Sequence, residues 1–254
     1  MTKEELDRYN RQIILPEFGV LAQEKLCKAS ALVIGVGGLG SIASLYLVAS
    51  GFGRVGLVDN DIVSISNLQR QILYRETEIG EPKTERAKDT LSKLNSSVKI
   101  ETYPCFLTEE NAISIIKDYD IIIDGTDNFK TRYLINDVCV GLGKPFVYGS
   151  IQSYSGQVSV FNVNDNSCNY RDLFPNAEEL SLKENTNKGV MGVLPSITAS
   201  LQVNEAIKII TSTGEPLINQ LLSFNISNNQ FITLDLTPTQ KAKGDSLEAF
   251  NKLK

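Results

Sequence analysis

The chain contains no histidine among its 254 residues, and this absence restricts its chemistry more than any other compositional feature. Without an imidazole there is no histidine proton relay, no histidine-activated nucleophile and no histidine metal ligand. Any catalysis must therefore work through carboxylates, cations, backbone dipoles or a bound ion.

Cysteine, excess basic charge and long apolar runs are also scarce. The four cysteines, Cys27, Cys105, Cys139 and Cys168, are far apart in the sequence, which suits a reducing cytoplasm better than a disulfide framework. The formal net charge of −5 disfavours a nucleic-acid partner. No apolar stretch approaches the roughly 20 residues of a membrane-spanning helix, and the N-terminus has no signal-peptide pattern. We therefore expect a cytoplasmic globular protein that binds neither membrane nor nucleic acid.

Strand and helix signals alternate from about residue 30 onward, which is typical of right-handed βαβ units around a parallel sheet. Apolar runs predict strands over residues 30–34, 54–58, 98–103, 120–128 (where the strand runs into a polar turn) and 145–150. Helical spacing of apolar residues predicts helices over residues 39–50, 83–94, 109–117 (capped by Thr108) and 130–142. The pattern predicts an α/β fold with a Rossmann-like, doubly wound sheet.

The pattern changes after residue 150. Alternation over 156–161 indicates antiparallel pairing, residues 192–211 predict a long helix, and segments 221–225 and 231–236 predict a closing hairpin around Asn228-Asn229. The polar stretch 176–189 has no apolar period and is expected to be a mobile crossover loop. The charged tail over 238–254 is expected to be a loose helix or disordered. Without a repeat or a linker rich in Pro, Gly or Ser, residues 1–254 are predicted to form one domain.

The glycine-rich stretch GVGGLG at 35–40 lies between the first predicted strand and the first predicted helix. Gly35, Gly37 and Gly40 allow backbone N–H groups and a helix N-terminus to approach a phosphate there. Asp59 ends the second strand 19 positions after Gly40, where an acidic residue binds ribose hydroxyls in dinucleotide-binding folds. The loop and the acid alone are compatible with a dehydrogenase as well as with other nucleotide-binding proteins.

The segment 67–83 favours a triphosphate over a dinucleotide. It carries Asn67, Arg70, Gln71 and Lys83 just beyond the predicted nucleotide pocket. A dinucleotide's pyrophosphate carries about two charges, whereas a triphosphate carries about four and needs cations to balance them. Taken singly, Arg70 and Lys83 are residues of a kind more often found on a solvated surface, so the prediction depends on their occurring together in this segment.

Asp127 follows the fourth predicted strand, at the carboxyl edge where doubly wound sheets bind ligands. A hard carboxylate at this edge suits Mg²⁺ that bridges phosphate oxygens. The residues alone leave a second interpretation open, in which Asp127 merely caps the helix that begins near Phe129.

Taken in series, these motifs make the chain resemble the ThiF/MoeB (HesA) group of adenylyltransferases, the prokaryotic relatives of ubiquitin-activating enzymes. The resemblance covers nearly the full length. Its segments are RYNRQIILPEFG (8–19), GVGGLGS (35–41), LVDNDIVSISNLQRQ (57–71), GEPKTERA (80–87), DGTDNFKTR (124–132), GQVSVF (156–161), YRDLFP (170–175) and LQVNEAIKII (201–210). Several ordered motifs are far more specific than a glycine loop.

The resemblance implies a homodimer that uses ATP and Mg²⁺ to adenylate the C-terminal Gly-Gly carboxylate of a small ubiquitin-like sulfur carrier of the ThiS/MoaD type, with release of pyrophosphate. It implies catalytic roles for Arg11, which would reach into the partner subunit's site, and for Arg70, Lys83 and the metal-binding Asp127. Asp59 and Asp61 would lie on the ribose side. The nucleotide-binding residues that it implies are Gly35, Gly37, Gly38, Gly40, Asp59, Asp61, Asn67, Gln71 and Asn128.

This reaction suits a chain without histidine. A peptide C-terminal carboxyl has a pKa of about 3.3–3.7, so it is ionised at neutral pH and attacks the α-phosphorus without a general base. Catalysis then consists of positioning and charge neutralisation, which Arg, Lys and Mg²⁺ provide.

The chain departs from the family at its thiols. Many relatives carry two CxxC pairs that bind structural zinc, but here Asp172 stands where the second cysteine is expected, Cys168 is displaced by one position, and no cysteine follows it. A tetrahedral thiolate site needs four ligands, so no zinc is expected. The segment 185–190 also lacks a thiol, so no persulfide or thioester is expected there. Cys168, in a polar stretch, is the one candidate for a reactive thiol.

The sequence leaves two alternative functions open. The first is adenylation of a different carboxylate, such as a peptide or the threonylcarbamoyl-adenosine of tRNA, although the acidic charge disfavours tRNA. The second is a non-catalytic or dehydrogenase-like nucleotide binder, against which the set Arg11, Arg70, Lys83 and Asp127 weighs. The sequence does not identify the carrier or decide between thiamine and molybdopterin synthesis.

Overall fold

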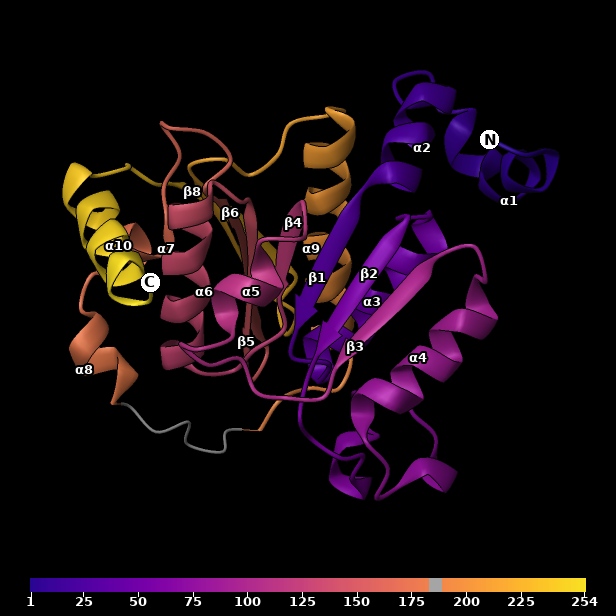
Figure 1. Ribbon diagram of the computed structural model, residues 1–254, viewed down its shortest axis with the longest axis horizontal. Helices are drawn as coiled ribbons and strands as arrows, with labels where there is room; N and C mark the ends of the chain where they lie inside the picture. The colour runs from indigo at the N-terminus through magenta and orange to yellow at the C-terminus, as the bar shows by residue number, and fades with distance from the viewer. Residues whose placement is uncertain (183–188) are drawn as a thin grey trace.

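A mixed sheet of eight strands organises the described part of the chain, in the order β3-β2-β1-β4-β5-β6-β7-β8 (Figure 1). The structure is a computed structural model, and it describes residues 1–182 and 189–254. The strands are β1 (Ser30–Ile34), β2 (Arg54–Val58), β3 (Lys99–Tyr103), β4 (Ile121–Asp124), β5 (Phe146–Gln152), β6 (Ser155–Phe161), β7 (Gln220–Asn225) and β8 (Gln230–Asp235).

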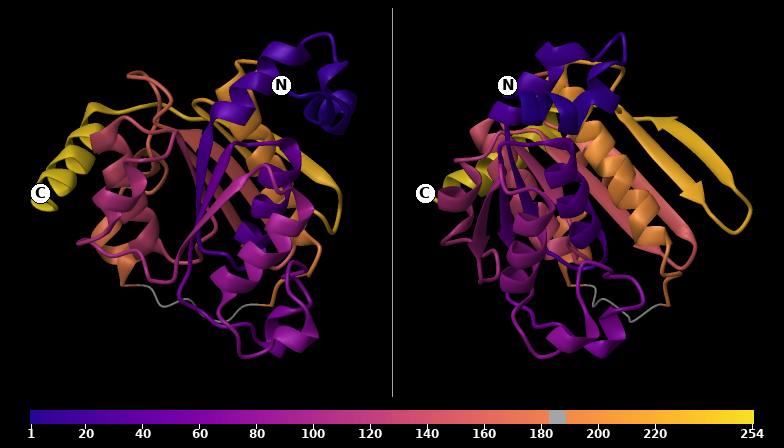
Figure 2. Two further views of the ribbon diagram at one scale, coloured as in Figure 1. Left: turned by 45° about the vertical axis from the view of Figure 1, so that its right-hand side comes forward. Right: turned by 90° about the vertical axis from the view of Figure 1, so that its right-hand side faces the viewer.

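The sheet has a parallel half and an antiparallel half. Strands β3, β2, β1, β4 and β5 pair in parallel, and β5 through β8 pair antiparallel. The predicted doubly wound architecture with an antiparallel continuation is therefore confirmed. Figure 2 shows the β7–β8 hairpin extending past the helices that cover the rest of the sheet.

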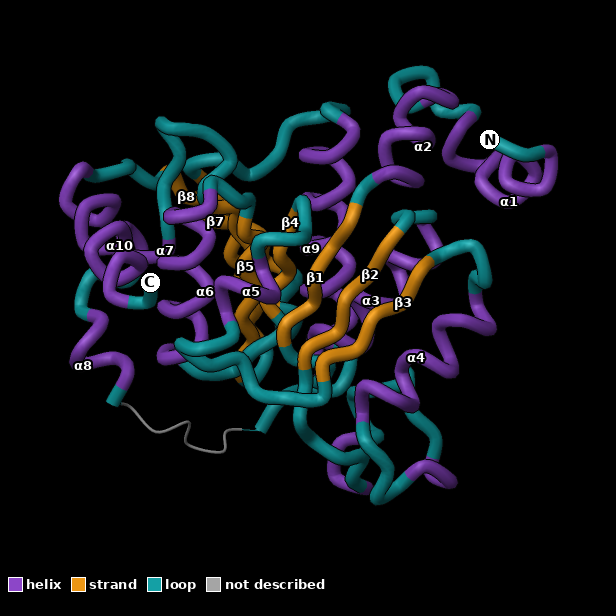
Figure 3. Tube along the Cα trace, viewed as in Figure 1, coloured by secondary structure: helices purple, strands orange, loops and turns teal. Residues whose placement is uncertain are grey.

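Helices cover both faces of the parallel half (Figure 3). Ala31 and Val33 of β1 pack into one apolar cluster, whereas Leu32 and Ile34 pack into a second cluster on the other face. The central strand is thus buried on both sides, as parallel strands are. The helices are α1 (Lys3–Ile13), α2 (Gly19–Lys28), α3 (Gly38–Ser50), α4 (Lys83–Leu94), α5 (Ala112–Ile116), α6 (Phe129–Leu142), α7 (Tyr170–Leu173), α8 (Ala177–Ser181), α9 (Leu194–Thr211) and α10 (Gln240–Lys252).

The helix predicted to begin at Glu109 with a Thr108 cap is shorter than expected, and that cap is wrong. Helix α5 begins at Ala112, and Asn111 precedes it. The Asn111 side chain accepts from the Thr108 backbone N–H (2.8 Å) and donates to the Phe106 carbonyl (2.9 Å). These two bonds close a local turn, which delays the start of the helix.

The tail predicted to be loose is an ordered helix, α10. Thr239 caps it by accepting from the Ala242 N–H (3.1 Å), and the helix packs against α6. Ala242, Ser246 and Phe250 recur every fourth position and are all buried, a helical stripe that the charged composition of the tail obscured.

The crossover segment predicted over 176–189 is also partly ordered, because α8 occupies Ala177–Ser181. Residues 183–188 lie outside the described residues, so the prediction for them stays a prediction. None of the described helices is long and apolar enough to cross a membrane.

Candidate active site

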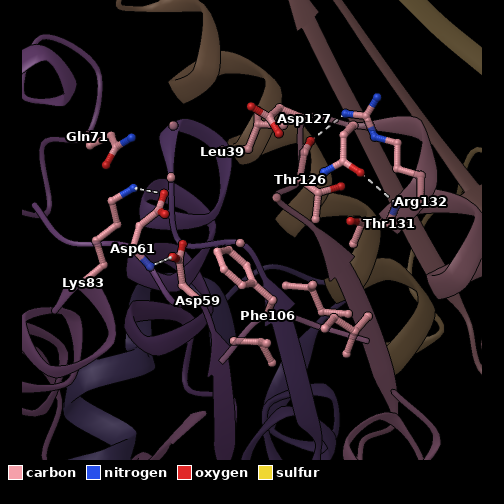
Figure 4. Close-up of a pocket in the computed structure, with 18 of the residues that line it drawn as sticks. Leu39, Asp59, Asp61, Gln71, Lys83, Phe106, Thr126, Asp127, Thr131 and Arg132 are labelled. Carbon is pink, nitrogen blue, oxygen red and sulfur yellow. Dashed lines mark hydrogen bonds and ion pairs between the residues drawn. The ribbon is translucent and has the colours of Figure 1, made fainter. Parts of the chain in front are cut away.

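A cavity of about 1110 Å³ opens at the carboxyl edge of the parallel strands (Figure 4). The loops that follow β1, β2, β3 and β4 contribute to its wall, together with the end of β5. The structure brings most of the sequence-predicted site residues together there. These are Gly35, Gly37, Gly38, Asp59, Asp61, Asn67, Arg70, Gln71, Lys83, Asp127 and Asn128.

The glycine loop is closely packed against the next strand. Gly35 has φ +83°, and a Cβ on it would lie 2.8 Å from the Gly125 carbonyl oxygen. A Cβ on Gly40 would lie 1.8 Å from the Gly35 carbonyl oxygen, which is impossible without a backbone shift. Gly40 is buried and does not line the cavity, so it acts on the loop through packing and not through contact with a ligand.

Two side chains hold the glycine loop from outside. Asp59 accepts from the Val36 N–H with one oxygen (2.6 Å) and from the Asp61 N–H with the other (2.8 Å). The Tyr74 hydroxyl donates to the Val36 carbonyl (2.8 Å), and burial raises the pKa of Tyr74, which keeps this donor protonated. Ionised carboxylates offer about four acceptor positions, so Asp59 can still accept from a ligand hydroxyl. Tyr74 carried no sequence signal for this role.

Lys83 and Asp61 form an ion pair at one wall of the cavity (Figure 4). The Lys83 Nζ lies 3.0 Å from an Asp61 carboxylate oxygen, and the lysine side chain is only 5% exposed whereas that of Asp61 is 59% exposed. The resemblance placed Asp61 on the ribose side. The structure gives it a more immediate role, as the counterion of the lysine.

The segment before α4 places Arg70 and Gln71 beside the glycine loop. Both residues donate their backbone N–H to the Asn67 carbonyl, and the Arg70 guanidinium donates to the Ser66 carbonyl (3.0 Å). Gln71 is 3% exposed, and its side-chain oxygen has no hydrogen-bond partner in the part of the chain that is described. Buried acceptors are normally satisfied, so this oxygen is suited to a ligand donor or water.

The turn after β4 supplies the opposite wall. Asn128 caps α6 by accepting from the Thr131 N–H (2.8 Å), so the interpretation of Asp127 as the helix cap is wrong. Asp127 lines the cavity across from Lys83 (Figure 4).

Arg132 fixes this turn and is a functional residue that sequence reasoning missed. Its guanidinium contacts the Asp124 carboxylate (2.9 Å), the Thr126 carbonyl (2.7 Å) and the Gly149 carbonyl (3.1 Å). Burial raises the pKa of the Asp124 carboxyl, and the neighbouring guanidinium opposes that rise. Gln202 of α9 donates to the Asp124 carbonyl (2.8 Å). Arg132 lies in the DGTDNFKTR segment, but only the fold shows what it contacts.

An apolar patch follows β3 on the floor of the cavity. Cys105, Phe106 and Leu107 line it, and Phe106 is 63% exposed and lines the same cavity as Asp59 (Figure 4). No periodic pattern pointed to this loop.

Arg11 does not line this cavity. It is exposed on α1, and Figure 1 shows α1 near the end of the sheet where β1 begins, away from the carboxyl edge. Within one chain, the structure therefore does not bring Arg11 to the other predicted catalytic residues.

Cys168 is not a reactive thiol, so that hypothesis is wrong. It is fully buried, and burial raises its pKa to about 12, so the thiol stays protonated at neutral pH. Asp172 accepts from the Asn169 N–H (2.9 Å) and from the Thr239 N–H and hydroxyl (both 2.8 Å). Its carboxylate thus ties this segment to the start of α10.

Comparison with known sequences gives one family over most of the chain. A sequence model described as the ThiF family matches residues 9–245. The chain is 45% identical over 251 residues to a protein named sulfur carrier protein adenylyltransferase from Thermus thermophilus, covering 96% of this chain and 93% of that one. It is 45% identical over 239 residues to a probable molybdopterin-synthase adenylyltransferase from Porphyra purpurea, covering 93% of this chain but less than two thirds (62%) of that longer protein.

Solved structures with the same fold include MccB from E. coli with ATP, at a TM-score of 0.82 and 24% identity, covering 92% of this chain and 73% of that one. PaaA has a TM-score of 0.81 and 24% identity, covering 94% of this chain and 76% of that one. At this level of identity the similarity concerns the fold alone.

Proposed function

The chain belongs to the ThiF family, and on that basis we propose that it is an ATP-dependent adenylyltransferase acting on a small ubiquitin-like sulfur carrier that ends in Gly-Gly. The carrier carboxylate attacks the α-phosphorus of ATP, the bond to the β-phosphate breaks, and pyrophosphate leaves. The product is an acyl-adenylate. The observation that carries this proposal is one cavity that joins the glycine loop, Arg70 and Lys83 with Asp127 on the facing wall.

We place the nucleotide along the carboxyl edge of the sheet. The triphosphate would lie at the glycine loop and the N-terminus of α3, where backbone N–H groups and the helix dipole favour anions. The ribose would lie toward Asp59, and the exposed Phe106 ring offers a flat apolar surface for the base.

Charge balance supports a metal ion in this proposal. The cationic lining residues Arg70, Lys83 and Arg132 are matched by Asp59, Asp61 and Asp127 among the described residues, so the wall is close to neutral. A tetra-anionic nucleotide therefore needs further positive charge. Magnesium is usually held by one or two carboxylates plus substrate phosphates, and Asp127 fits that requirement. Bound there, Mg²⁺ would neutralise phosphate charge.

A second source of positive charge is the partner subunit. We propose a homodimer in which Arg11 acts in the neighbouring cavity, because Arg11 is exposed and lies outside its own. Residues 1–254 of each chain then form one catalytic domain, and each of the two active sites of the dimer contains residues from both chains.

The catalytic residues need only position the reactants and neutralise the phosphate charge. The attacking carboxylate is already ionised, so no proton must be removed and no histidine is needed. Arg70 and Lys83 bind the phosphates, and Arg132 holds the turn that carries Asp127. We further propose that the reaction serves molybdopterin or thiamine synthesis in the cytoplasm, where the four unbridged thiols are stable.

Isotope exchange tests this function. With labelled pyrophosphate, ATP should become labelled only when the protein is given a carrier with an intact C-terminal Gly-Gly. A carrier shortened by its last glycine is the matched control, and Asp127→Asn should abolish exchange. Calorimetry should show binding of ATP with Mg²⁺ and none of NAD⁺. Exchange without a carrier, or micromolar NAD⁺ binding without ATP binding, would refute the proposal.

A further inference from the structure

The ammonium of Lys83 already has a counterion before any nucleotide enters. It is buried at the start of α4, and it pairs with the Asp61 carboxylate at 3.0 Å. A buried ammonium is stable as a cation only when it is paired, because burial removes its hydration. Asp61 lines the same cavity in which a phosphate must meet this lysine. A phosphate and Asp61 therefore compete for one cation.

The two residues differ in how firmly their side chains are held. Their backbones are fixed to each other, since the Lys83 N–H donates to the Asp61 carbonyl (2.9 Å) and Ile62 forms a bridge with Pro82. The lysine side chain is enclosed, but the aspartate side chain is 59% exposed. The carboxylate can therefore turn into solvent without disturbing the backbone that places Lys83.

We propose that Asp61 is a displaceable counterion of Lys83. Its carboxylate leaves the Lys83 ammonium when a phosphate binds there and pairs with it again when the phosphate leaves. This exchange of partners speeds the release of pyrophosphate. This inference rests on the function proposed above. Competition from the Asp61 carboxylate lowers the affinity of the site for any phosphate chain. ATP keeps its ribose and base contacts, whereas pyrophosphate has phosphate contacts only, so the product leaves readily.

Three roles for Asp61 give three different results for Asp61→Asn. A displaceable counterion predicts tighter binding of pyrophosphate, because a competitor is lost. A ribose ligand predicts weaker ATP binding and unchanged pyrophosphate binding, because pyrophosphate has no ribose. A residue that only positions Lys83 predicts weaker pyrophosphate binding.

Calorimetric titration with magnesium pyrophosphate measures this on the enzyme alone. Asp61, the member of the pair that must leave, is 59% exposed, and contacts of exposed carboxylates contribute modestly, so Asp61→Asn should lower the dissociation constant of pyrophosphate by about threefold to fivefold. Glu85→Gln removes the same charge from an exposed position two residues beyond Lys83 and outside the cavity, and should leave the constant unchanged. Thermal unfolding of both variants checks the fold.

A double-mutant cycle isolates the pair. In a Lys83→Gln background, Asp61→Asn should no longer tighten pyrophosphate binding, because the cation for which it competes is gone. Unchanged or weaker pyrophosphate binding in Asp61→Asn would overturn the inference, as would equal tightening in the Lys83→Gln background. Carrier-dependent exchange by the unaltered protein tests the proposed function separately, so the two failures are distinguishable.

Discussion

Replacement of Arg132 by Met should destabilise the protein strongly, because it leaves the Asp124 carboxylate buried without its cation. Arg132 is 6% exposed and Asp124 is 0% exposed. Removing one partner of a buried ion pair costs about 3–5 kcal/mol. In a chain of this size 1 kcal/mol shifts the melting temperature by about 2–4 °C, so a fall of about 6–20 °C is expected. Thermal unfolding followed by circular dichroism measures it.

The loss should depend on pH in a defined direction. Burial already raises the pKa of Asp124, and removal of the guanidinium takes away a factor that lowers it. A carboxyl whose pKa is higher in the folded than in the unfolded state does not lower the free energy of unfolding below the unfolded-state pKa, where it is protonated in both states. As pH rises above that value, the carboxyl lowers the free energy of unfolding by an increasing amount. The deficit of Arg132→Met should therefore be smaller at about pH 5 than at about pH 8.

A second substitution serves as the control. Asp124→Asn in the Arg132→Met background removes the stranded charge while its amide oxygen can still accept from Thr126. The double variant should recover part of the lost stability and lose the pH dependence of the deficit. A fall of less than about 3 °C for Arg132→Met, with no change between the two pH values, would refute this account of the pair.

Substitution of Gly40, labelling of the thiols and substitution of Arg11 give three further tests. Gly40→Ala should lower the free energy of unfolding by at least about 1–3 kcal/mol and abolish ATP binding in calorimetry, because its Cβ would overlap a loop carbonyl. Iodoacetamide should modify Cys105 in the native protein slowly, since burial raises its pKa, and more slowly still with ATP and Mg²⁺ present, whereas Cys168 should react only after unfolding; equal labelling of both would contradict the burial. Arg11→Ala should slow adenylation by at least about 10²-fold, and mixing it with Asp127→Ala should restore activity if subunits exchange; failure of every mixed dimer would exclude supply in trans.

The strands and most helices could be predicted from the sequence because their signals are local. The apolar spacing over 83–94 predicts a helix with the same first and last residues as α4, and the alternation of β1 between two apolar faces follows from an uninterrupted apolar run. The error at α5 came from one side chain, Asn111, whose bonds compete with the helix. The helix α10 was missed because its three buried residues are separated by charged ones.

The composition of the site could be predicted, but not its internal contacts. The motif order placed Lys83 and Asp127 on one cavity, and the fold brings them to facing walls. Which atoms pair within the cavity depends on side-chain direction, and sequence spacing does not fix that direction. Asp61 and Lys83, which form an ion pair, lie 22 positions apart in the chain. Tyr74 lies 38 positions from Val36, the residue of the glycine loop to which its hydroxyl donates.

The most direct test of the proposed activity is the intact mass of the carrier after incubation with ATP, Mg²⁺ and the protein. The carrier should gain the mass of one adenylyl group, hydroxylamine should remove that group, and a carrier without its final glycine should gain no mass. An unchanged mass in every carrier ending in Gly-Gly, while the protein binds ATP, would show that the protein is not an adenylyltransferase of such carriers.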